Sequence, residues 1–376
     1  MQNNKLFFDS TIGIIGGGQL GRMMTTAAKH MGYRVVVLDP TPDCPTAQVA
    51  DDQIVAAYDD LEAIEQLAGK SDVITYEFEN VDVNAAQILE EKGILPQGAH
   101  SLRVTQDREL EKQAMVDSDQ PVSDFAIVRS EDDLRNEAKQ IGFPSVVKTC
   151  RGGYDGKGQV KLTSEADIDE AIDMLHQAGR VIIEKWVPFD KEISIIFTRT
   201  IDGDISYFPV AENNHRDHIL HATIAPGRVS EAVAEKARQA AAAIAETIGV
   251  VGTFAIEMFV SGENVLINEM APRPHNSGHY TIEACSVSQF EQHIRAICRL
   301  PLAPIHFHGG AVMVNLLGKD VTPFFDQFVT EMPNAHPHMY GKQENKPQRK
   351  MGHATFIGED PVKIYNELVD KKIIED

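Results

Sequence analysis

A lysine and a glycine-rich loop lie together near the middle of the sequence. Lys148 falls in the apolar run SVVKT, and the loop RGGYDGKGQ, which carries Lys157, follows at once. The N–H groups of such a loop can close over phosphates, and an ammonium group neutralises charge that grows during phosphoryl transfer. The loop does not match G-x-x-x-x-G-K-[ST], so P-loop chemistry is not supported. We predict a polyphosphate site of another kind; the alternative is a mobile surface hairpin.

Two acids and an amide further along the chain form a candidate cation site. Glu257 lies in GTFAIEMFV, and Asn268 and Glu269 lie in VLINEM, with the turn signal SGEN between the two segments. Facing antiparallel strands would bring these oxygen-bearing side chains together. Mg²⁺ prefers oxygen ligands and usually keeps substrate phosphates in its shell, so this set is sufficient. The alternative is that the acids point into solvent.

A second glycine pattern, GGGQLG, follows the apolar run TIGII. Gly16, Gly18 and Gly21 satisfy G-x-G-x-x-G, and Asp39 ends the next apolar run, where an acid would bind a ribose. The pattern requires only that the backbone approach a phosphate at a helix N-terminus. We favour a sugar phosphate as the ligand. A dinucleotide, as in an NAD-dependent oxidoreductase, and a purely structural turn stay open.

The elements that position these groups begin with an alternating pattern. Apolar runs alternate with helix-like segments, which predicts a mainly parallel sheet in the first hundred residues or so. The runs are 11–15, 35–38 and 73–75, and the helix-like segments are 19–31, 60–69 and 82–92.

Two further lobes follow a helix-like segment at 104–117. Strand, helix and strand patterns through 124–149, 158–162 and 165–185 predict a small lobe around the glycine loop. Paired strands within 191–212 and 253–269, separated by an Ala-rich helix at 230–247, predict a third, antiparallel lobe. Glu184 ends an apolar strand just before the only Trp, and such a segment between two lobes can offer backbone groups to an adenine edge.

Composition limits the classes of protein that fit. A chain of 376 residues with 43% hydrophobic and 24% charged residues suits a globular protein of two or three domains. The formal charge of -21 argues against a nucleic-acid surface. The N-terminus lacks a signal-peptide pattern, no run is long enough to span a membrane, and the four cysteines show no disulfide or zinc spacing. We expect a cytoplasmic protein without a membrane or nucleic-acid partner.

Taken together, the motifs resemble the ATP-grasp superfamily and, within it, the 5-(carboxyamino)imidazole ribonucleotide synthases of purine biosynthesis. The resemblance covers nearly the whole chain and is carried by GIIGGGQLGRM, DVITYEFENV at 72–81, KTCRGGYDGKGQ at 148–159 and INEMAPRPHNSGHYTIEAC at 267–285. It implies an α/β and α+β fold with an N-terminal Rossmann-like (pre-ATP-grasp) domain at 1–102. An ATP-grasp domain at 103–300, with a small lobe at about 120–188 and a main lobe at about 189–300, and a small C-terminal lobe at 301–376 would follow.

The resemblance also implies an activity: an ATP-dependent C–N ligase that joins bicarbonate to 5-aminoimidazole ribonucleotide through carboxyphosphate. Glu257 and Glu269 would hold Mg²⁺, with Mn²⁺ an alternative, and the protein would be a homodimer. Another group would contact ATP. Its members are Arg108, Lys148, Gly153, Tyr154, Asp155, Gly156, Lys157, Gly158, Gln159, Glu184, Lys185, Trp186, Val187, Glu192, His215, Asn268 and Glu269.

The same resemblance assigns the carboxylation chemistry. Arg273, His275 and Lys350 would receive bicarbonate or carboxyphosphate, and Asp155 would act as a base or as an orienting acceptor. The aminoimidazole substrate would contact a set that includes both glycine motifs: Gln19, Leu20, Tyr154, Asp155, Lys157, Arg273 and Lys350. Structural roles for Arg273, His275 and Lys350 stay open. So do a biotin carboxylase, a formate-using glycinamide ribonucleotide transformylase and a nucleotide sensor without turnover, against which YDGKGQ, EFEN and the acid pair argue.

Overall fold

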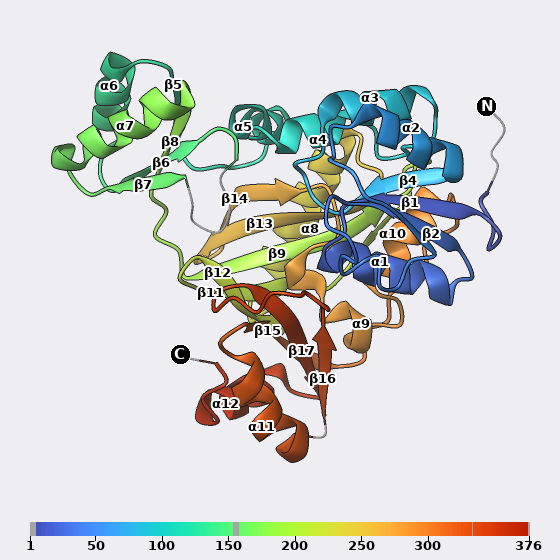
Figure 1. Cartoon of the computed structure of the whole chain (residues 1–376). Helices are drawn as coiled ribbons and strands as arrows, with labels where there is room; N and C mark the ends of the chain where they lie inside the picture. Colours follow the sequence, from blue (N-terminus) through green and yellow to red (C-terminus); the bar gives the residue numbers. More distant parts are fainter. Residues whose placement is uncertain (1–4, 153–157, 333, 375–376) are drawn as a thin grey trace.

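The computed structural model describes residues 5–152, 158–332 and 334–374. Its strands form three sheets, and Figure 1 shows the N-terminal domain and the small lobe standing apart above a large central sheet. The C-terminal helices lie at the opposite end of the molecule from the small lobe. The α/β and α+β architecture that we predicted is confirmed.

The N-terminal sheet is parallel, with strand order β3-β2-β1-β4. Its strands are nearly continuous apolar runs because helices cover both faces of a parallel sheet. The strands are β1 (Thr11–Ile15), β2 (Arg34–Leu38), β3 (Asp52–Ile54) and β4 (Val73–Tyr76). The helices are α1 (Gln19–His30), α2 (Leu61–Lys70), α3 (Val83–Glu91) and α4 (His100–Thr105).

The single helix that we predicted at 104–117 is wrong. The chain forms α4, which ends at Thr105, and then α5 (Arg108–Asp117). Asp107 lies between them in an extended conformation, and its side chain accepts a hydrogen bond from the Glu109 N–H group. This N-cap satisfies a free donor of α5 and so starts a new helix.

The small lobe is an antiparallel sheet, in the order β5-β8-β6-β7, covered by two helices. Val147 and Ile183 from the sheet pack with Leu134 and Ile172 from the helices in a core of its own. The strands are β5 (Phe125–Val128), β6 (Ser145–Thr149), β7 (Gln159–Leu162) and β8 (Val181–Lys185). The helices are α6 (Glu131–Ile141), η1 (Glu165–Asp167) and α7 (Ile168–Ala178).

The large sheet has the order β14-β13-β9-β11-β12-β15-β17-β16, with β10 beside β9. Phe197 and Phe254 pack against the alanine-rich face of α8 in its main core. The strands up to residue 271 are β9 (Lys191–Arg199), β10 (Ile205–Tyr207), β11 (Ala211–Arg216), β12 (Ile219–Ala225), β13 (Gly252–Ser261) and β14 (Asn264–Ala271). The helices are α8 (Glu231–Ile248), η2 (Asn276–Gly278), α9 (Thr281–Ala284) and α10 (Gln289–Ile297).

The C-terminal lobe continues the same sheet. Strand β15 (Gly310–Leu317) pairs antiparallel with β12, and β17 (Lys350–Gly358) and β16 (Ala335–Met339) follow. Helices α11 (Val321–Glu331) and α12 (Pro361–Asp370) cover these strands (Figure 1). No helix within the described residues is long and apolar enough to cross a membrane.

Candidate active site

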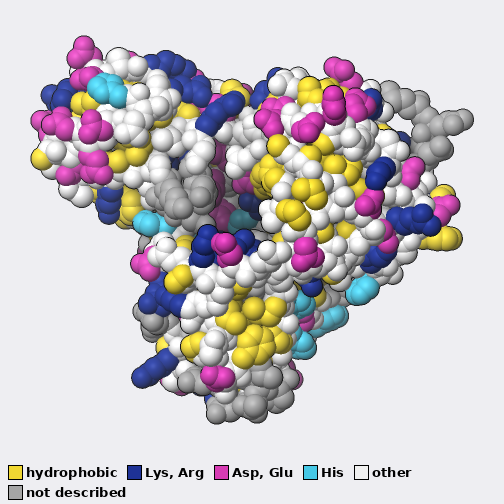
Figure 2. Space-filling view, viewed as in Figure 1, with side chains coloured by type: hydrophobic (Ala, Val, Ile, Leu, Met, Phe, Trp, Pro, Cys, Tyr) yellow, Lys and Arg dark blue, Asp and Glu magenta, His cyan; other side chains and the backbone are white. Residues whose placement is uncertain are grey.

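A cavity of about 1000 Å³ lies where the lobes meet. Figure 2 shows the surface hollowed between the small lobe and the N-terminal domain, with charged side chains at the edge of the hollow. The cavity is lined by every predicted site residue that the structure describes: Gln19, Leu20, Arg108, Lys148, Gly158, Gln159, Glu184, Lys185, Trp186, Val187, Glu192, His215, Glu257, Asn268, Glu269, Arg273, His275 and Lys350. The predicted residues Gly153, Tyr154, Asp155, Gly156 and Lys157 lie outside the described residues.

One wall of the cavity is positively charged. The Lys148 Nζ atom lies 3.1 Å from Oε1 of Glu184, and Lys112 Nζ lies 3.2 Å from Oε2 of the same carboxylate. Burial alone would raise the pKa of Glu184, but the two ammonium groups outweigh it and lower that pKa to about 2. Glu184 therefore stays ionised and holds Lys148 beside the cavity.

Lys112 was missed by the sequence analysis. It is almost fully buried on α5, and it also donates to the carbonyl of Asn268 at 3.1 Å. Its position four residues after Arg108 places both cations on one face of the helix. The four-residue spacing from Arg108 was the signal in the sequence that could have identified Lys112. The ion-pair partner of Lys112, Glu184, lies in another lobe and gave no such signal.

The predicted metal ligands face each other on β13 and β14. Glu257 and Glu269 are register partners in the antiparallel ladder. Burial, followed by the charge of Glu269, raises the pKa of Glu257, so the two carboxylates repel. A divalent cation between them would remove that repulsion, and the oxygen donors suit Mg²⁺. Among residues 5–152, 158–332 and 334–374, no group of three or more His, Cys, Asp or Glu side chains could hold a metal ion.

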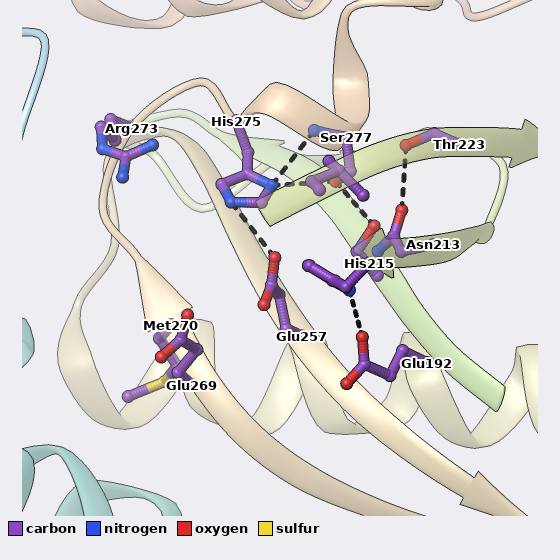
Figure 3. Close-up of polar contacts among 12 residues, drawn as sticks. Glu192, Asn213, His215, Thr223, Glu257, Glu269, Met270, Arg273, His275 and Ser277 are labelled. Atoms are coloured by element: carbon purple, nitrogen blue, oxygen red, sulfur yellow. Dashed lines mark hydrogen bonds and ion pairs between the residues drawn. The ribbon is translucent and has the colours of Figure 1, made fainter. Parts of the chain in front are cut away.

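His275 faces this acid pair (Figure 3). Its Nε2 atom lies 3.3 Å from Oε1 of Glu257, and its Nδ1 atom accepts a hydrogen bond from the Ser277 N–H group at 3.3 Å. Burial, then the charges of Arg273 and Lys350, hold the pKa of His275 well below its usual range. The ring is therefore neutral, and the hydrogen bond to Nδ1 assigns its proton to Nε2. His275 therefore contributes a hydrogen-bond donor to the site.

Arg273 is held by an acid of the N-terminal domain. Its Nε and Nη2 atoms lie 2.6 and 2.8 Å from the two carboxylate oxygens of Glu79. Gln106 Nε2 donates to the carbonyls of Glu79 and Val81, each at 2.6 Å, and so fixes the EFENV segment. The Arg273–Glu79 fork ties the domain that carries the first glycine motif to the loop after β14.

His215 and Glu192 form an ion pair on the side of Glu257 that faces away from Glu269 (Figure 3). Burial opposes a charged ring, but the Glu192 carboxylate more than compensates and raises the pKa of His215. Nearby, Asn213 accepts a hydrogen bond from the Thr223 hydroxyl at 3.1 Å and braces the β11–β12 hairpin. The predicted ligand His215 is therefore held in place by its neighbours.

The phosphate site that we predicted at the first glycine motif stays a prediction. In this structure the backbone donors of the motif bind carboxylates. The N–H groups of Gly18 and Gly21 donate to the carboxylate of Glu77, and that of Gly17 donates to Asp39 at 2.7 Å. These donors at the α1 N-terminus are satisfied by acids in this structure, and burial raises the pKa of one of them, Glu77. Gln19 and Leu20 still line the cavity. A G-x-G-x-x-G motif fits both a phosphate site and a turn whose N–H groups bind carboxylates. The sequence pattern alone could not distinguish the two.

The segment after β8 differs from our expectation in one respect. The Lys185 and Trp186 N–H groups donate to the carbonyls of Asp124 and Pro144, at 2.8 and 3.1 Å, so neither is available to an adenine edge. An apolar surface is present instead: Phe189 and Phe259, which both line the cavity, stack with their ring centroids 4.7 Å apart.

The chain is similar to known proteins over nearly its whole length. Family models match it as a ribonucleotide synthetase preATP-grasp domain (10–106), an ATP-grasp domain (113–290) and a phosphoribosylaminoimidazole carboxylase C-terminal domain (311–367). The N5-carboxyaminoimidazole ribonucleotide synthase of Bacillus subtilis (strain 168) is 46% identical over 376 residues, which cover 99% of this chain and 97% of that protein.

Solved structures agree. An N5-carboxyaminoimidazole ribonucleotide synthetase in complex with ADP superposes with a TM-score of 0.95 at 49% identity, and the match covers 99% of this chain and 98% of that one. The Aspergillus clavatus enzyme in complex with ADP and 5-aminoimidazole ribonucleotide has a TM-score of 0.90 at 29% identity, with 98% and 99% covered. The chain therefore belongs to the N5-carboxyaminoimidazole ribonucleotide synthase family and is an ATP-grasp ligase.

Proposed function

We propose that this chain uses ATP to carboxylate 5-aminoimidazole ribonucleotide with bicarbonate, giving 5-(carboxyamino)imidazole ribonucleotide, ADP and phosphate. The observation that carries the proposal is that one cavity is lined by Lys148 and its partner Glu184, by the Glu257–Glu269 pair and by the Arg273–His275 segment. Relatives bind ADP and, in one case, the aminoimidazole substrate, which supports the same assignment here.

Bicarbonate needs activation because its charge is delocalised and hydroxide is a poor leaving group. Transfer of the γ-phosphoryl group to a bicarbonate oxygen gives carboxyphosphate, whose leaving group is phosphate. The exocyclic amine of the aminoimidazole then forms the new C–N bond, and the amine proton passes to a base. We assign that base, or an orienting acceptor, to Asp155.

The residues of the cavity divide into groups by charge. Lys148 and Arg108 bind the phosphates of ATP from the positive wall, whose ionised partner Glu184 keeps Lys148 in place. Glu257, Glu269 and Asn268 would hold Mg²⁺, which neutralises phosphate charge when it is bound. Phe189 and Phe259 offer an apolar surface to the base of the nucleotide.

Arg273, His275 and Lys350 receive the bicarbonate. The guanidinium of Arg273, oriented by Glu79, supplies positive charge, and the neutral His275 donates a hydrogen bond from Nε2. Charges and donors that are already in place before the reaction can lower a barrier by several kcal/mol, or about 10² to 10³ in rate. Lys350 lies at the start of β17 and lines the same cavity.

Domain boundaries, oligomeric state and cellular location are further parts of the proposed function. We propose a division into 1–102, 103–300 and 301–376, which the matches at 10–106, 113–290 and 311–367 support. We also propose a cytoplasmic homodimer.

ADP release by the purified protein tests the proposal. We expect steady release with ATP, Mg²⁺, bicarbonate and 5-aminoimidazole ribonucleotide together, and loss of it when either the ribonucleotide or bicarbonate is omitted. Release that continues at the full rate without the ribonucleotide would refute the assigned substrate.

A further inference from the structure

Gln289, the first residue of α10, binds the backbone of His275 with both ends of its side-chain amide. Its Oε1 atom accepts from the His275 N–H group at 2.8 Å, and its Nε2 atom donates to the His275 carbonyl at 2.7 Å. Gln289 is fully buried and does not line the cavity. The Gln289 amide therefore satisfies both backbone groups of His275, as the backbone of a paired β-strand would, although Gln289 lies outside the cavity.

The segment that carries His275 has few backbone bonds of its own. Pro272 and Pro274 flank Arg273, and neither has an N–H group to donate. Another side-chain amide, that of Gln97, donates to the carbonyl of Pro272 at 3.0 Å. Side chains from other elements therefore hold this turn where a strand ladder would otherwise do so.

Gln289 is fixed at both of its backbone groups. Its N–H group donates to the hydroxyl of Thr281, and its carbonyl accepts from the hydroxyl of Thr253, each at 3.0 Å. Thr253 belongs to β13, the strand that also carries Glu257, the partner of the His275 ring. A closed chain of contacts thus runs from Glu257 through His275 and Gln289 back to β13.

Gly278 leaves the space that this arrangement needs. A Cβ atom at position 278 would lie 2.6 Å from Oε1 of Gln289 and would also collide with Ile196. Real Cβ atoms essentially never come that close to another heavy atom, so a side chain there would displace the amide.

We infer that Gln289 is a positioning residue for the reaction: it fixes the backbone of His275 and thereby sets the imidazole against Glu257 in the cavity. The inference rests on the proposed role of His275. A displacement of about 1 Å at a reacting group can cost about a hundred-fold in rate, so a residue outside the cavity can control turnover in this way.

The same helix supplies a matched control. Gln292 is equally buried, and its amide makes the same pair of bonds to the backbone of Ala303, with Oε1 accepting at 3.0 Å and Nε2 donating at 2.9 Å. Ala303 does not line the cavity. Gln289→Met leaves the His275 N–H group without its acceptor, while the His275 carbonyl keeps the Gly278 N–H group at 3.0 Å. Gln292→Met removes both bonds to Ala303 and a third bond to the Ser206 hydroxyl, so the control loses at least as many hydrogen bonds.

The test compares these variants in the full chain. We expect Gln289→Met to lower kcat by about ten-fold to a hundred-fold, with KM for ATP within two-fold or so of wild type, while Gln292→Met keeps kcat within about two-fold at a similar loss of Tm. Gln289→Glu keeps the acceptor for the His275 N–H group but loses the donor, and it should lower kcat in the same direction. Equal kcat losses in the Gln289 and Gln292 variants would overturn the inference.

A double-mutant cycle distinguishes an effect of Gln289 through His275 from a general loss of structure. In a His275→Ala background, adding Gln289→Met should change kcat by less than about two-fold, because the two residues act as one unit. An unchanged ten-fold loss in that background would overturn the inference.

Failure of the proposed function can be told apart from failure of this inference. If the wild-type chain shows no ribonucleotide-dependent turnover, the NMR shift of the His275 imidazole still reports its position. A shift change in Gln289→Met and none in Gln292→Met would support the positioning role, and no change in either would overturn it.

Discussion

Glu184 is the residue that pairs with two buried ammonium groups, of which that of Lys148 lines the cavity. Lys112 and Lys148 both pair with its carboxylate, which is itself almost fully buried. Without that carboxylate, two positive charges would face each other with little solvent between them. The charge of the site and the stability of the fold therefore depend on the same side chain.

This arrangement predicts an acid-dependent loss of stability. The pKa of Glu184 is about 2 in the folded chain against a usual 4.5. The group therefore adds stability, roughly 3 kcal/mol, that is fully present above about pH 4.5 and is lost as the pH falls toward 2. The difference in the free energy of unfolding between wild type and Glu184→Gln, measured with urea, should be largest near pH 6. This difference should become smaller toward pH 3. A gap that stays constant with pH would contradict the assignment. Glu246→Gln, at an exposed glutamate, is the control.

The Glu257–Glu269 pair predicts that activity depends on Mg²⁺ through Glu269. Glu269→Gln should lower turnover by about a hundred-fold and raise the Mg²⁺ concentration needed for half-maximal rate, because the proposed metal site loses one of its two charges. The fold should be kept, since Glu269 is partly exposed. The control is Glu263→Gln, at an exposed acid in the turn between the same strands. Wild-type Mg²⁺ dependence in Glu269→Gln would remove the metal assignment.

Helix α5 is the element that joins the small lobe to the main lobe at the cavity. Asp107 caps it through Oδ1, while its Oδ2 atom lies 3.0 Å from Arg151 Nε and 2.5 Å from Arg180 Nη2. Burial would raise the pKa of Asp107, but the hydrogen bonds from these guanidinium groups outweigh it and lower that pKa. The cap of α5 and the base of the glycine loop thus share one carboxylate.

Asp107→Asn separates those two roles. The amide can keep the cap through its oxygen, but its NH₂ group would face two guanidinium groups. We expect KM for ATP to rise by about ten-fold, since loss of a hydrogen bond to a charged group costs about 1.5 kcal/mol. Asp60→Asn, at the N-cap of α2, does not touch the cavity lining and should leave KM unchanged. An unchanged KM in Asp107→Asn would show that the network does not position the ATP site.

The whole molecule is organised around one sheet that runs from β14 to β16. Phe356 on β17 packs in one core with Ile224 on β12, so the C-terminal lobe is part of the main lobe's packing.

Phe356→Ala should lower the free energy of unfolding by about 3 to 5 kcal/mol and also reduce hydrogen-exchange protection in β12. Phe8→Ala, at a side chain 70% exposed, should change stability by less than about 0.5 kcal/mol. Unchanged protection in β12 would mean that the lobes unfold separately.

Local pattern predicted much of this fold. Apolar runs located β1, β2 and β4, and the turn signal SGEN located the hairpin that brings Glu257 opposite Glu269. What could not be predicted depends on contacts between distant segments. Lys112 reaches a backbone carbonyl 156 residues away. Gly18 and Gly21 bind Glu77 only because β4 lies beside β1 in the sheet.

We propose that this cavity transfers the γ-phosphoryl group of ATP to bicarbonate before the C–N bond forms. The most direct measurement is ³¹P NMR of the phosphate released when the bicarbonate carries heavy oxygen. Because phosphate leaves carboxyphosphate with the oxygen that bicarbonate contributed, we predict that each phosphate formed carries one heavy oxygen atom. Phosphate free of the label, released in step with the carboxylated product, would contradict phosphoryl transfer to bicarbonate.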